Sequence, residues 1–406
     1  MDLTLTPARL AGTVRLPASK SVAHRMLLCA AFAEGESALS GFSLSADMEA
    51  TLNGLAALGA QAEISGDTVK IRPGAAPAGH LIDCGESGST LRFLIPPAIV
   101  RSGGEETAFA GRGRLMERPL GPYFRIFEEK GVSYRREGDR LAVKGSLPAG
   151  RYALSGRVSS QFVTGLLFGL SLLEGDSEIV ITDRLESRSY VSLTLAAMAR
   201  CGVTARNDGW ERFSIPGGQK YCPFSGEVEG DWSQAAFFLG MNFLGGTVKL
   251  EGLDPDSLQG DRAVIRILGQ MEQPGGLTVD CADIPDLIPA LAVAAAGRRS
   301  GSVTFANAAR LRMKESDRIA STAALIRALG GAAEEGRDFL RIPAAARLAG
   351  GTVDCANDHR IAMAAAEASC ICEGPVRLLG AECVRKSYPA FWEDFARLGG
   401  KAEECR

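Results

Sequence analysis

The sequence predicts an α/β protein of two similar domains, each made of three repeats. Two observations support this prediction. The length of 406 residues exceeds what a single hydrophobic core usually organises, and one helix-to-strand pattern recurs along the chain. In this pattern an amphipathic helix ends at a glycine that can adopt the left-handed C-cap conformation, and a short strand follows. The recurring glycines are Gly59, Gly131, Gly202, Gly330 and Gly399.

Turn residues follow most copies of this pattern. After four of the five glycines, the short strand is followed by a polar turn and a second strand, as expected for a β-hairpin. These turns are Gly66-Asp67, Gly138-Asp139, Asp208-Gly209 and Gly336-Arg337. The interval between Gly202 and Gly330 is nearly twice the others, which leaves room for a further copy around Leu268 to Val279. We therefore expect six units, each with two helices and several strands.

The connection between the two domains is expected near Glu227 to Asp231. A helix is predicted directly after it, over residues 232–243. The N-terminal segment, Met1 to Leu16, reads as strands that can return to the second half of the chain. The predicted domains are therefore residues 1–19 together with 229–406, and residues 20–228. The chain would pass between them twice, near residues 18–20 and 229–231.

Short polar clusters stand directly before long apolar runs at several places in the chain. The runs have helix-forming composition and begin with Ser, Asp or Gly, so the clusters are predicted at helix N-termini. Free N–H groups and a partial positive charge make such an end suitable for phosphates and carboxylates, although each exposed end contributes only about 0.3–1 kcal/mol. The Lys and Arg side chains in the same clusters would strengthen anion binding. The clusters are Ser19-Lys20-Ser21, Gly88-Ser89-Thr90, Ser159-Ser160-Gln161, Ser187 to Tyr190, Lys314 to Arg318 and Asp358-His359-Arg360.

Composition and charge argue against several classes of protein. The net charge is −3 and no run of basic residues stands out, so a nucleic-acid partner is not expected. No stretch has the length and composition of a membrane span, and the first residues do not read as a signal or transit peptide, so we expect a cytoplasmic protein. The ten cysteines include no Cys-x-x-Cys pair and the three histidines are far apart in sequence. Neither a disulfide framework nor a metal site is predicted.

Nine motifs, in order along nearly the whole chain, resemble those of one enzyme family. They are Ala18-Ser-Lys-Ser-Val-Ala-His-Arg25, Glu86-Ser-Gly-Ser-Thr-Leu-Arg92, Leu115-Met-Glu-Arg118-Pro119, Ser159-Ser-Gln161, Ser187-Arg-Ser-Tyr190, Ile284-Pro-Asp286, Lys314-Glu-Ser-Asp-Arg318, Asp358-His-Arg360 and Lys386. Any one of them is a weak signal that helix capping alone would explain. Together, at the family's spacing, they resemble the EPSP synthases, the 3-phosphoshikimate 1-carboxyvinyltransferases of the enolpyruvyl transferase family.

This resemblance implies a fold, a reaction and a place for the active site. The family's fold has two domains, each built from three βαβαββ units, with the active site in the interdomain cleft. The reaction, a step of chorismate and aromatic amino acid biosynthesis, moves the enolpyruvyl group of phosphoenolpyruvate to the 5-hydroxyl of shikimate 3-phosphate. It implies no metal ion and no organic cofactor. The family also suggests a monomer that acts on small molecules and is the target of glyphosate.

The resemblance assigns two sets of binding residues. Those expected to hold shikimate 3-phosphate are Ser21, Arg25, Ser159, Ser160, Gln161, Ser187, Tyr190, Asp286 and Lys314. Those expected to hold phosphoenolpyruvate are Lys20, Gly88, Arg118, Gln161, Arg318, Arg360 and Lys386. Hydroxyls, helix-start amides and cationic side chains suit these anions. At Gly88, a close approach of the backbone to the ligand would leave no room for a Cβ atom.

The implied chemistry needs two proton transfers. One proton must reach the methylene carbon of phosphoenolpyruvate, and one must leave the attacking hydroxyl. Asp286 is the candidate base for the hydroxyl. Glu315 and Lys20 are both candidates for delivery of the proton to carbon, and the sequence does not rank them.

Two alternatives remain open at this stage. UDP-N-acetylglucosamine enolpyruvyl transferases share the fold and the chemistry, but they carry a cysteine in the loop corresponding to Gly111 to Arg118, and this loop has none. The second alternative is a non-catalytic protein that binds phosphorylated metabolites on the same scaffold. Loss of Lys20, Asp286 or Glu315 would favour it, and all three residues are present.

Overall fold

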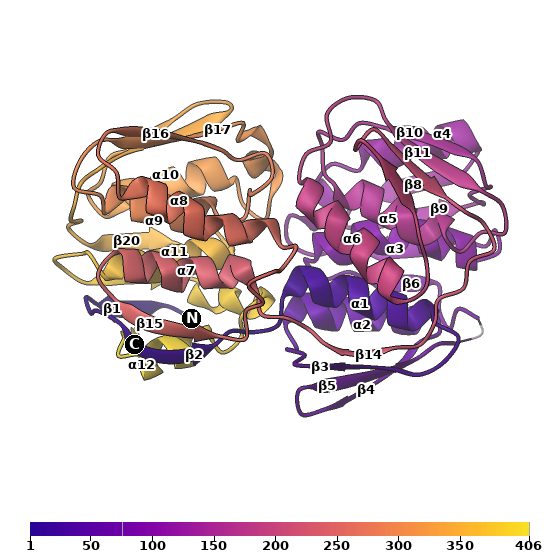
Figure 1. Ribbon diagram of the computed structural model, residues 1–406, viewed down its shortest axis with the longest axis horizontal. Helices are drawn as coiled ribbons and strands as arrows, with labels where there is room; N and C mark the ends of the chain where they lie inside the picture. Colours follow the sequence, from indigo (N-terminus) through magenta and orange to yellow (C-terminus); the bar gives the residue numbers. More distant parts are fainter. Residues whose placement is uncertain (75, 406) are drawn as a thin grey trace. The chain divides into compact units, whose positions relative to one another are not determined.

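The computed structural model describes residues 1–74 and 76–405, and the chain forms two compact units (Figure 1). The first unit comprises Met1–Pro17 and Gly230–Arg406, and the second comprises Ala18–Glu229. The division expected from the sequence differs from these boundaries by one or two residues. At the crossing points, Ser19 N donates to Glu229 O at 2.7 Å, and Asp231 N donates to Pro17 O at 3.0 Å.

The second unit contains three four-stranded sheets with strand orders β14-β3-β5-β4, β6-β7-β9-β8 and β10-β11-β13-β12. In each sheet the first two strands are parallel and the remaining pairs are antiparallel. Its helices are α1 (Lys20–Phe32), α2 (Ala46–Ala57), α3 (Gly88–Arg101), α4 (Gly121–Lys130), α5 (Gln161–Leu170) and α6 (Arg188–Arg200), with a short 3-10 helix η1 (Leu115–Glu117). Its strands are β3 (Ser37–Ser40), β4 (Gln61–Ser65), β5 (Thr68–Arg72), β6 (Leu81–Asp83), β7 (Thr107–Ala110), β8 (Ser133–Glu137), β9 (Arg140–Lys144), β10 (Arg151–Leu154), β11 (Ser177–Ile181), β12 (Arg206–Asp208), β13 (Arg212–Ile215) and β14 (Ser225–Glu227).

The first unit repeats this plan with two four-stranded sheets, β16-β17-β19-β18 and β20-β21-β1-β22, and the pair β15-β2. The N-terminal strands β1 (Leu3–Thr6) and β2 (Ala11–Arg15) thus pair with strands from the second half of the chain. The helices are α7 (Trp232–Phe243), α8 (Val264–Met271), α9 (Ile288–Ala296), α10 (Arg318–Ala328), α11 (His359–Ser369) and α12 (Phe391–Arg397), with 3-10 helices η2 (Gly260–Ala263), η3 (Ala309–Met313) and η4 (Ala381–Lys386). The strands are β15 (Thr247–Glu251), β16 (Gly276–Asp280), β17 (Ser302–Ala306), β18 (Glu334–Glu335), β19 (Phe339–Pro343), β20 (Gly351–Asp354), β21 (Val376–Leu379) and β22 (Lys401–Glu404).

The recurring pattern of the sequence corresponds to a repeated strand–helix–strand–helix–strand–strand unit. The run β6, α3, β7, α4, β8, β9 is one complete copy, and β10 to β13 and β16 to β19 are others. The five recurring glycines all have positive φ, from 71° at Gly131 to 97° at Gly59, as expected at helix C-termini. The four predicted turns join the antiparallel pairs β4-β5, β8-β9, β12-β13 and β18-β19.

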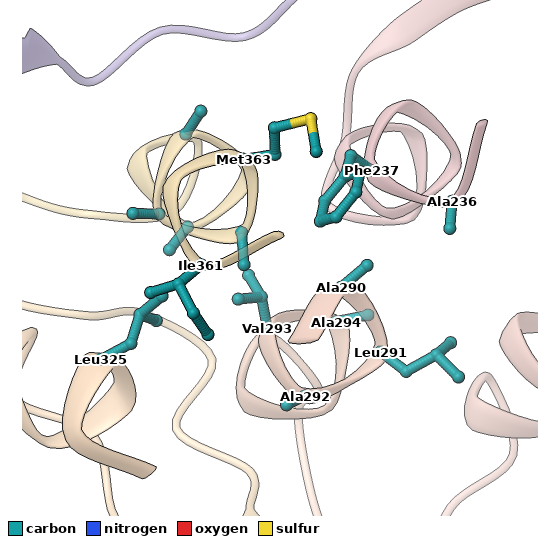
Figure 2. Close-up of a cluster of buried hydrophobic side chains, with 14 of the residues drawn as sticks. Ala236, Phe237, Ala290, Leu291, Ala292, Val293, Ala294, Leu325, Ile361 and Met363 are labelled. Atoms are coloured by element: carbon teal, nitrogen blue, oxygen red, sulfur yellow. The ribbon is translucent and has the colours of Figure 1, made fainter. Parts of the chain in front are cut away.

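Small residues let the helices of each unit pack closely. In the first unit, α7, α9, α10 and α11 contribute buried side chains that meet in one cluster (Figure 2). Most of α9 is Ala, so its backbone comes near to its neighbours. In the second unit, a Cβ atom on Gly165 of α5 would overlap the carbonyl oxygen of Arg92 in α3, and one on Gly169 would lie 2.6 Å from Pro96 Cβ. This packing fixes the helix N-termini that carry the polar clusters.

The six polar clusters lie at helix starts, as predicted. Ser19, Ser87, Asp317 and Asp358 each accept a hydrogen bond from a backbone N–H in the first turn of α1, α3, α10 and α11. Within residues 1–74 and 76–405, no helix has both the length and the apolar character needed to cross a membrane.

Candidate active site

The start of α1 places Lys20 beside a carboxylate. Lys20 Nζ lies 2.8 Å from Asp47 Oδ2, and both side chains are largely buried. Asp47 belongs to the first turn of α2, where the helix N-terminus favours a negative charge. This ion pair orients the ammonium group, which the sequence predicts to contact phosphoenolpyruvate.

Arg25 connects α1 to α6. Its Nε donates to Thr194 Oγ1 at 2.8 Å, its Nη1 to Ser21 O at 2.6 Å and its Nη2 to Tyr190 O at 2.8 Å. The guanidinium lies 5.0 Å from the ring centroid of Phe93. Burial lowers the pKa of Arg25 to about 9. These bonds use three of the five N–H groups of the guanidinium, one each to Thr194, Ser21 and Tyr190.

Arg118 lies directly over the start of α3. A Cβ atom on Gly88 would overlap the Arg118 guanidinium, so glycine at this position seats Arg118, whereas the sequence suggested that it makes room for the ligand itself. Only 8% of Arg118 is exposed, and its buried Nε has no hydrogen-bond partner in the described part of the chain. Among those residues Arg118 also forms no ion pair. A buried cation without a carboxylate partner is suited to an anionic ligand.

Gln161 links α5 to α3. Its Nε2 donates to Ser89 Oγ at 3.0 Å, and its Oε1 accepts a hydrogen bond from Arg92 Nη1 at 2.6 Å. Ser159 Oγ accepts from Gln161 N at 3.3 Å, at the start of α5. The predicted Ser159-Ser160-Gln161 cluster therefore lies next to the Gly88 cluster. The sequence assigns these clusters to two substrates that react with each other, so the two clusters are expected to be neighbours.

Ser187, the residue before α6, has an unusual backbone conformation. Its φ is 55° and its ψ 47°, the left-handed region that residues other than glycine seldom adopt. Ser187 is buried. Such strain is often retained at functional positions, and here it presents a serine at the N-terminus of a helix.

Asp286 is the centre of the cluster in the first unit. Its Oδ1 lies 2.6 Å from Arg318 Nη1 and 3.2 Å from Lys314 Nζ. Its Oδ2 lies 3.4 Å from Arg360 Nη2. Three cations around one carboxylate stabilise its ionised form, the form that can accept a proton.

Arg318 is held by two further carboxylates. Its Nε lies 2.8 Å from Asp358 Oδ2 and its Nη2 lies 2.7 Å from Glu315 Oε2. Only 1% of the Arg318 side chain is exposed, and burial opposes its charge. The neighbouring carboxylates outweigh that effect and raise its pKa. Ser316 Oγ donates to Asp358 Oδ2 at 3.0 Å, which fixes this carboxylate in turn.

Lys314 and Lys386 complete the cluster of cations. Burial lowers the pKa of Lys314 to about 8, although Asp286 opposes the shift. Its charge is therefore sensitive to pH in the neutral to mildly alkaline range. Lys386 Nζ donates to Asn357 O at 2.6 Å, in the turn that leads into α11.

The structure thus groups the predicted residues in two sets, one on each unit. The set on the second unit is Lys20, Ser21, Arg25, Gly88, Arg118, Ser159, Ser160, Gln161, Ser187 and Tyr190. The set on the first unit is Asp286, Lys314, Glu315, Arg318, Arg360 and Lys386. Each set combines cations with hydroxyl or carboxylate groups at helix starts.

Sequence reasoning assigned no role to Asp47, Asp358 or Thr194. Asp47 and Asp358 are carboxylate partners of Lys20 and Arg318. Thr194 supports Arg25. Both aspartates lie at helix starts, and this position can be predicted from the sequence. The partner of each cannot, because it depends on contacts between elements that are distant in sequence.

Comparison with known proteins places the chain in a family. The model of the family described as EPSP synthase (3-phosphoshikimate 1-carboxyvinyltransferase) matches residues 5–395. The chain belongs to the EPSP synthase family. The match spans both units and includes every predicted site residue.

Individual relatives agree with this family. A 3-phosphoshikimate 1-carboxyvinyltransferase from Clostridium kluyveri is 42% identical, over 99% of this chain and 98% of the relative. One from Clostridioides difficile is 39% identical, again over 99% of this chain and 98% of the relative. The solved structure of EPSP synthase from Acinetobacter baumannii has a TM-score of 0.81 at 24% identity and covers 99% of this chain and 100% of that one.

These matches confirm the family, the enzyme class and the two-domain enolpyruvyl transferase fold expected from the sequence. They favour an enzyme that acts on shikimate 3-phosphate over a UDP-N-acetylglucosamine enolpyruvyl transferase and over a non-catalytic protein.

Proposed function

We propose that the protein transfers the enolpyruvyl group of phosphoenolpyruvate to the 5-hydroxyl of shikimate 3-phosphate, giving 5-enolpyruvylshikimate 3-phosphate and inorganic phosphate. The observation that carries this proposal is the cluster around Asp286. There a carboxylate that can accept a proton lies among three cations that can hold anions. Membership of the family supplies the reaction type.

Shikimate 3-phosphate is assigned to residues with hydroxyl, amide and cationic groups. Its phosphate is assigned to Ser159, Ser160 and Gln161 at the start of α5, with Ser187 and the remaining N–H groups of Arg25. Helix-start N–H groups, hydroxyls and a guanidinium together suit a dianion. Ser21 and Tyr190, which Arg25 positions, are assigned to the same substrate. Lys314 and Asp286 would bind its hydroxyls.

Phosphoenolpyruvate is assigned mainly to cationic residues of the two units. Arg118 has no carboxylate partner among the described residues. Arg360 lies at the start of α11 and shares Asp286 with two other cations. Lys20, Arg318, Lys386, Gly88 and Gln161 complete the set. Catalysis on this assignment needs residues from both units to act on one pair of substrates.

The proton steps follow from these positions. The methylene carbon of phosphoenolpyruvate gains a proton, and the adjacent carbon becomes electrophilic. Asp286 removes the proton from the attacking 5-hydroxyl as the new C–O bond forms. The tetrahedral intermediate then loses a proton from its methyl group and expels inorganic phosphate, which restores the double bond. Glu315 and Lys20 remain the two candidates for proton delivery, each held by a partner of opposite charge.

The proposal also includes a monomer that works in the cytoplasm on small molecules. The net charge of −3, without a basic run, supports the absence of a nucleic-acid partner.

Product identification tests the proposed function directly. The protein is incubated with phosphoenolpyruvate and shikimate 3-phosphate, and the mixture is followed by ³¹P and ¹H nuclear magnetic resonance. We expect free phosphate and a new enol ether at the 5-oxygen of shikimate 3-phosphate in equal amounts. Free phosphate without the enol ether would indicate simple hydrolysis and would reject the proposal.

A further inference from the structure

The Thr51 network is a set of hydrogen-bonded side chains in the second unit, made up of His24, Thr51, Thr90 and Ser87. His24 Nδ1 lies 2.8 Å from Thr51 Oγ1, which lies 2.7 Å from Thr90 Oγ1. Thr90 Oγ1 donates in turn to Ser87 Oγ at 2.7 Å. All of these residues are fully buried, and the reaction proposed above uses none of them.

The bond between His24 and Thr51 lies one helical turn beyond the ion pair of Lys20 with Asp47. That ion pair, at 2.8 Å, joins the starts of α1 and α2. His24 follows Lys20 by four residues, so the two side chains lie on one face of α1. Thr51 follows Asp47 by four residues in α2, and its Oγ1 lies 3.1 Å from Asp47 O. Two contacts one turn apart fix both the separation and the register of α1 and α2.

The bond between Thr51 and Thr90 extends this register to α3. Ser87 is the N-cap of α3, and its Oγ accepts from Thr90 N at 3.2 Å as well as from Thr90 Oγ1. Gly88 lies between these two residues in sequence, so the turn that carries it is held from both sides. A Cβ atom on Gly54, three residues after Thr51, would overlap a side chain of α3, so glycine there lets α2 approach α3.

A polar network in a hydrophobic core fixes geometry more strictly than apolar packing does. The core around Thr51 is mostly apolar, and apolar contacts tolerate small shifts, whereas hydrogen bonds weaken steeply as their angle departs from linear. The Thr51 hydroxyl has one proton and two lone pairs, so it can bond to His24 and Thr90 at once. An apolar side chain of the same shape would fill this space, so the hydroxyl points to a role in positioning.

We propose that Thr51 is a positioning residue for phosphoenolpyruvate: its bonds to α1 and α3 hold Lys20 and Gly88 in the relative position that this substrate requires. The inference rests on the proposed function, which assigns Lys20 and Gly88 to phosphoenolpyruvate. Arg118 depends on the same contacts, because its guanidinium lies directly over Gly88. Thr51 is fully buried and acts through these residues, without contact to the substrate.

The effect should be selective for phosphoenolpyruvate. The Thr51 network belongs to α1, α2 and α3, whereas the phosphate of shikimate 3-phosphate is assigned to the starts of α5 and α6. Arg25, on α1, belongs to the shikimate 3-phosphate set and is held by separate bonds to Thr194 Oγ1 and Tyr190 O of α6. Removal of the Thr51 hydroxyl leaves those bonds in place. It should therefore weaken the binding of one substrate and spare the other.

The first test is Thr51→Val, which replaces the hydroxyl with a methyl group of similar size. KM for each substrate is measured by phosphate release with the other substrate saturating. We expect KM for phosphoenolpyruvate to rise by about tenfold, because His24 and Thr90 lose their shared partner and the three helix starts lose their register. KM for shikimate 3-phosphate should stay within about twofold of the value for the unaltered protein, a division that general destabilisation does not produce.

Thr51→Ser tests whether the hydroxyl itself is responsible. Serine keeps the donor and the acceptor, so KM for phosphoenolpyruvate should stay within about twofold of the value for the unaltered protein. This variant lacks one buried methyl group, whereas Thr51→Val keeps the volume of the side chain. If Thr51 acted only by filling space, Thr51→Ser would show the defect and Thr51→Val would not.

Thr322→Val is the matched control. Thr322 lies in α10 and is fully buried, and its Oγ1 has no hydrogen-bond partner within residues 1–74 and 76–405. The same substitution there removes a hydroxyl but breaks no hydrogen bond, so both KM values should be unchanged. If Thr51→Val does not fold, as judged by circular dichroism, Thr90→Val carries the same prediction, because it removes the other partner of the bond between α2 and α3.

The outcomes separate this inference from the function on which it rests. If the unaltered protein releases phosphate and Thr51→Val leaves KM for phosphoenolpyruvate unchanged, or raises both KM values equally, the inference is wrong and the proposed function stands. A defect in Thr51→Ser as large as that in Thr51→Val also rejects the inference. If the unaltered protein releases no phosphate with shikimate 3-phosphate, the proposed function fails and the inference fails with it.

Discussion

The Asp286 side chain combines two roles, as the candidate base and as the shared partner of three cations. Three cations lie within 3.4 Å of its carboxylate, so removal of its charge affects both proton transfer and the arrangement of Lys314, Arg318 and Arg360. Hydrogen bonding and charge are separable by an amide substitution, because Asn keeps the shape and one acceptor oxygen.

Asp286→Asn should lower kcat by about 10²-fold or more, because it removes the candidate base. Shikimate 3-phosphate should still bind, since its phosphate is assigned to residues on the other unit. Steady-state rates and calorimetric titration with shikimate 3-phosphate provide the comparison, with Asp256→Asn as a control for loss of an exposed carboxylate. Turnover within a few-fold of the unaltered protein would transfer the role of base to Glu315 or Lys20.

Arg118→Ala should act on binding. Loss of a charged hydrogen-bonding partner for the substrate is expected to raise KM for phosphoenolpyruvate by about 10- to 100-fold, with kcat changed less. Arg125→Ala, which removes an exposed arginine of α4, is the matched control and should leave both constants unchanged. A loss confined to kcat would show that Arg118 contacts the transition state selectively, contrary to its assignment.

At the level of single residues, the sequence identified groups but not their partners. Lys20, Arg318 and Asp286 were predicted from motifs. Their neighbours Asp47 and Asp358 depend on which helix starts come together in the fold, and that information is spread over the whole chain. The left-handed conformation of Ser187 was also not predicted, because serine has no intrinsic preference for it.

At the level of helices and strands, local signals were sufficient in most places. The helix starts at Lys20, Gly88, Arg318 and His359 follow capping residues, and these signals act over three or four residues. The close contact of α3 with α5 was not predicted, because it depends on two glycines whose packing role appears only in three dimensions. The same two helices are joined by the hydrogen bond from Arg92 of α3 to Gln161 of α5, and Gln161 is a candidate site residue.

Gly165→Ala should destabilise the second unit by about 1–3 kcal/mol, because the added methyl group overlaps the carbonyl oxygen of Arg92 and the hydroxyl of Tyr123. Urea denaturation followed by circular dichroism measures the change. Gly121→Ala, at the start of α4, adds a Cβ that meets nothing within 4 Å in the described chain and should be neutral or stabilising by up to about 1 kcal/mol. Equal effects of the two substitutions would refute the packing argument.

Lys314, in the segment between η3 and α10, should make the affinity for shikimate 3-phosphate depend on pH. Lys314 has a pKa of about 8 because burial disfavours its charge, and only the protonated form attracts the ligand. Affinity should therefore fall as pH rises above about 8, by up to tenfold per unit. Calorimetric titrations between pH 7 and about 9.5 test this expectation.

Lys314→Arg provides the control for this pH dependence, since a guanidinium has a much higher intrinsic pKa than an ammonium group. Its affinity for shikimate 3-phosphate should lose the decline centred near pH 8, even if it is weaker overall, and any decline near pH 9 is assigned to Arg25. A decline that persists in Lys314→Arg would assign the titration to another group.

At the level of the whole molecule, the repeat in the sequence was the most informative signal. Recurring glycines and hairpin turns indicated six similar units, and the family and the solved relative confirm the two-domain fold. The N-terminal strands β1 and β2 belong to the first unit, an arrangement that periodicity alone only suggested. The predicted site residues are divided between the two units. The complete reaction is therefore the appropriate test of their assignment, because it requires both sets.

The rate of phosphate release from phosphoenolpyruvate with different acceptors tests the central claim most directly. We expect release with shikimate 3-phosphate and none above background with UDP-N-acetylglucosamine or with no acceptor. The Asp286→Asn variant, measured in parallel, excludes a contaminating phosphatase. Release that is faster with UDP-N-acetylglucosamine, or that does not depend on an acceptor, would contradict the account.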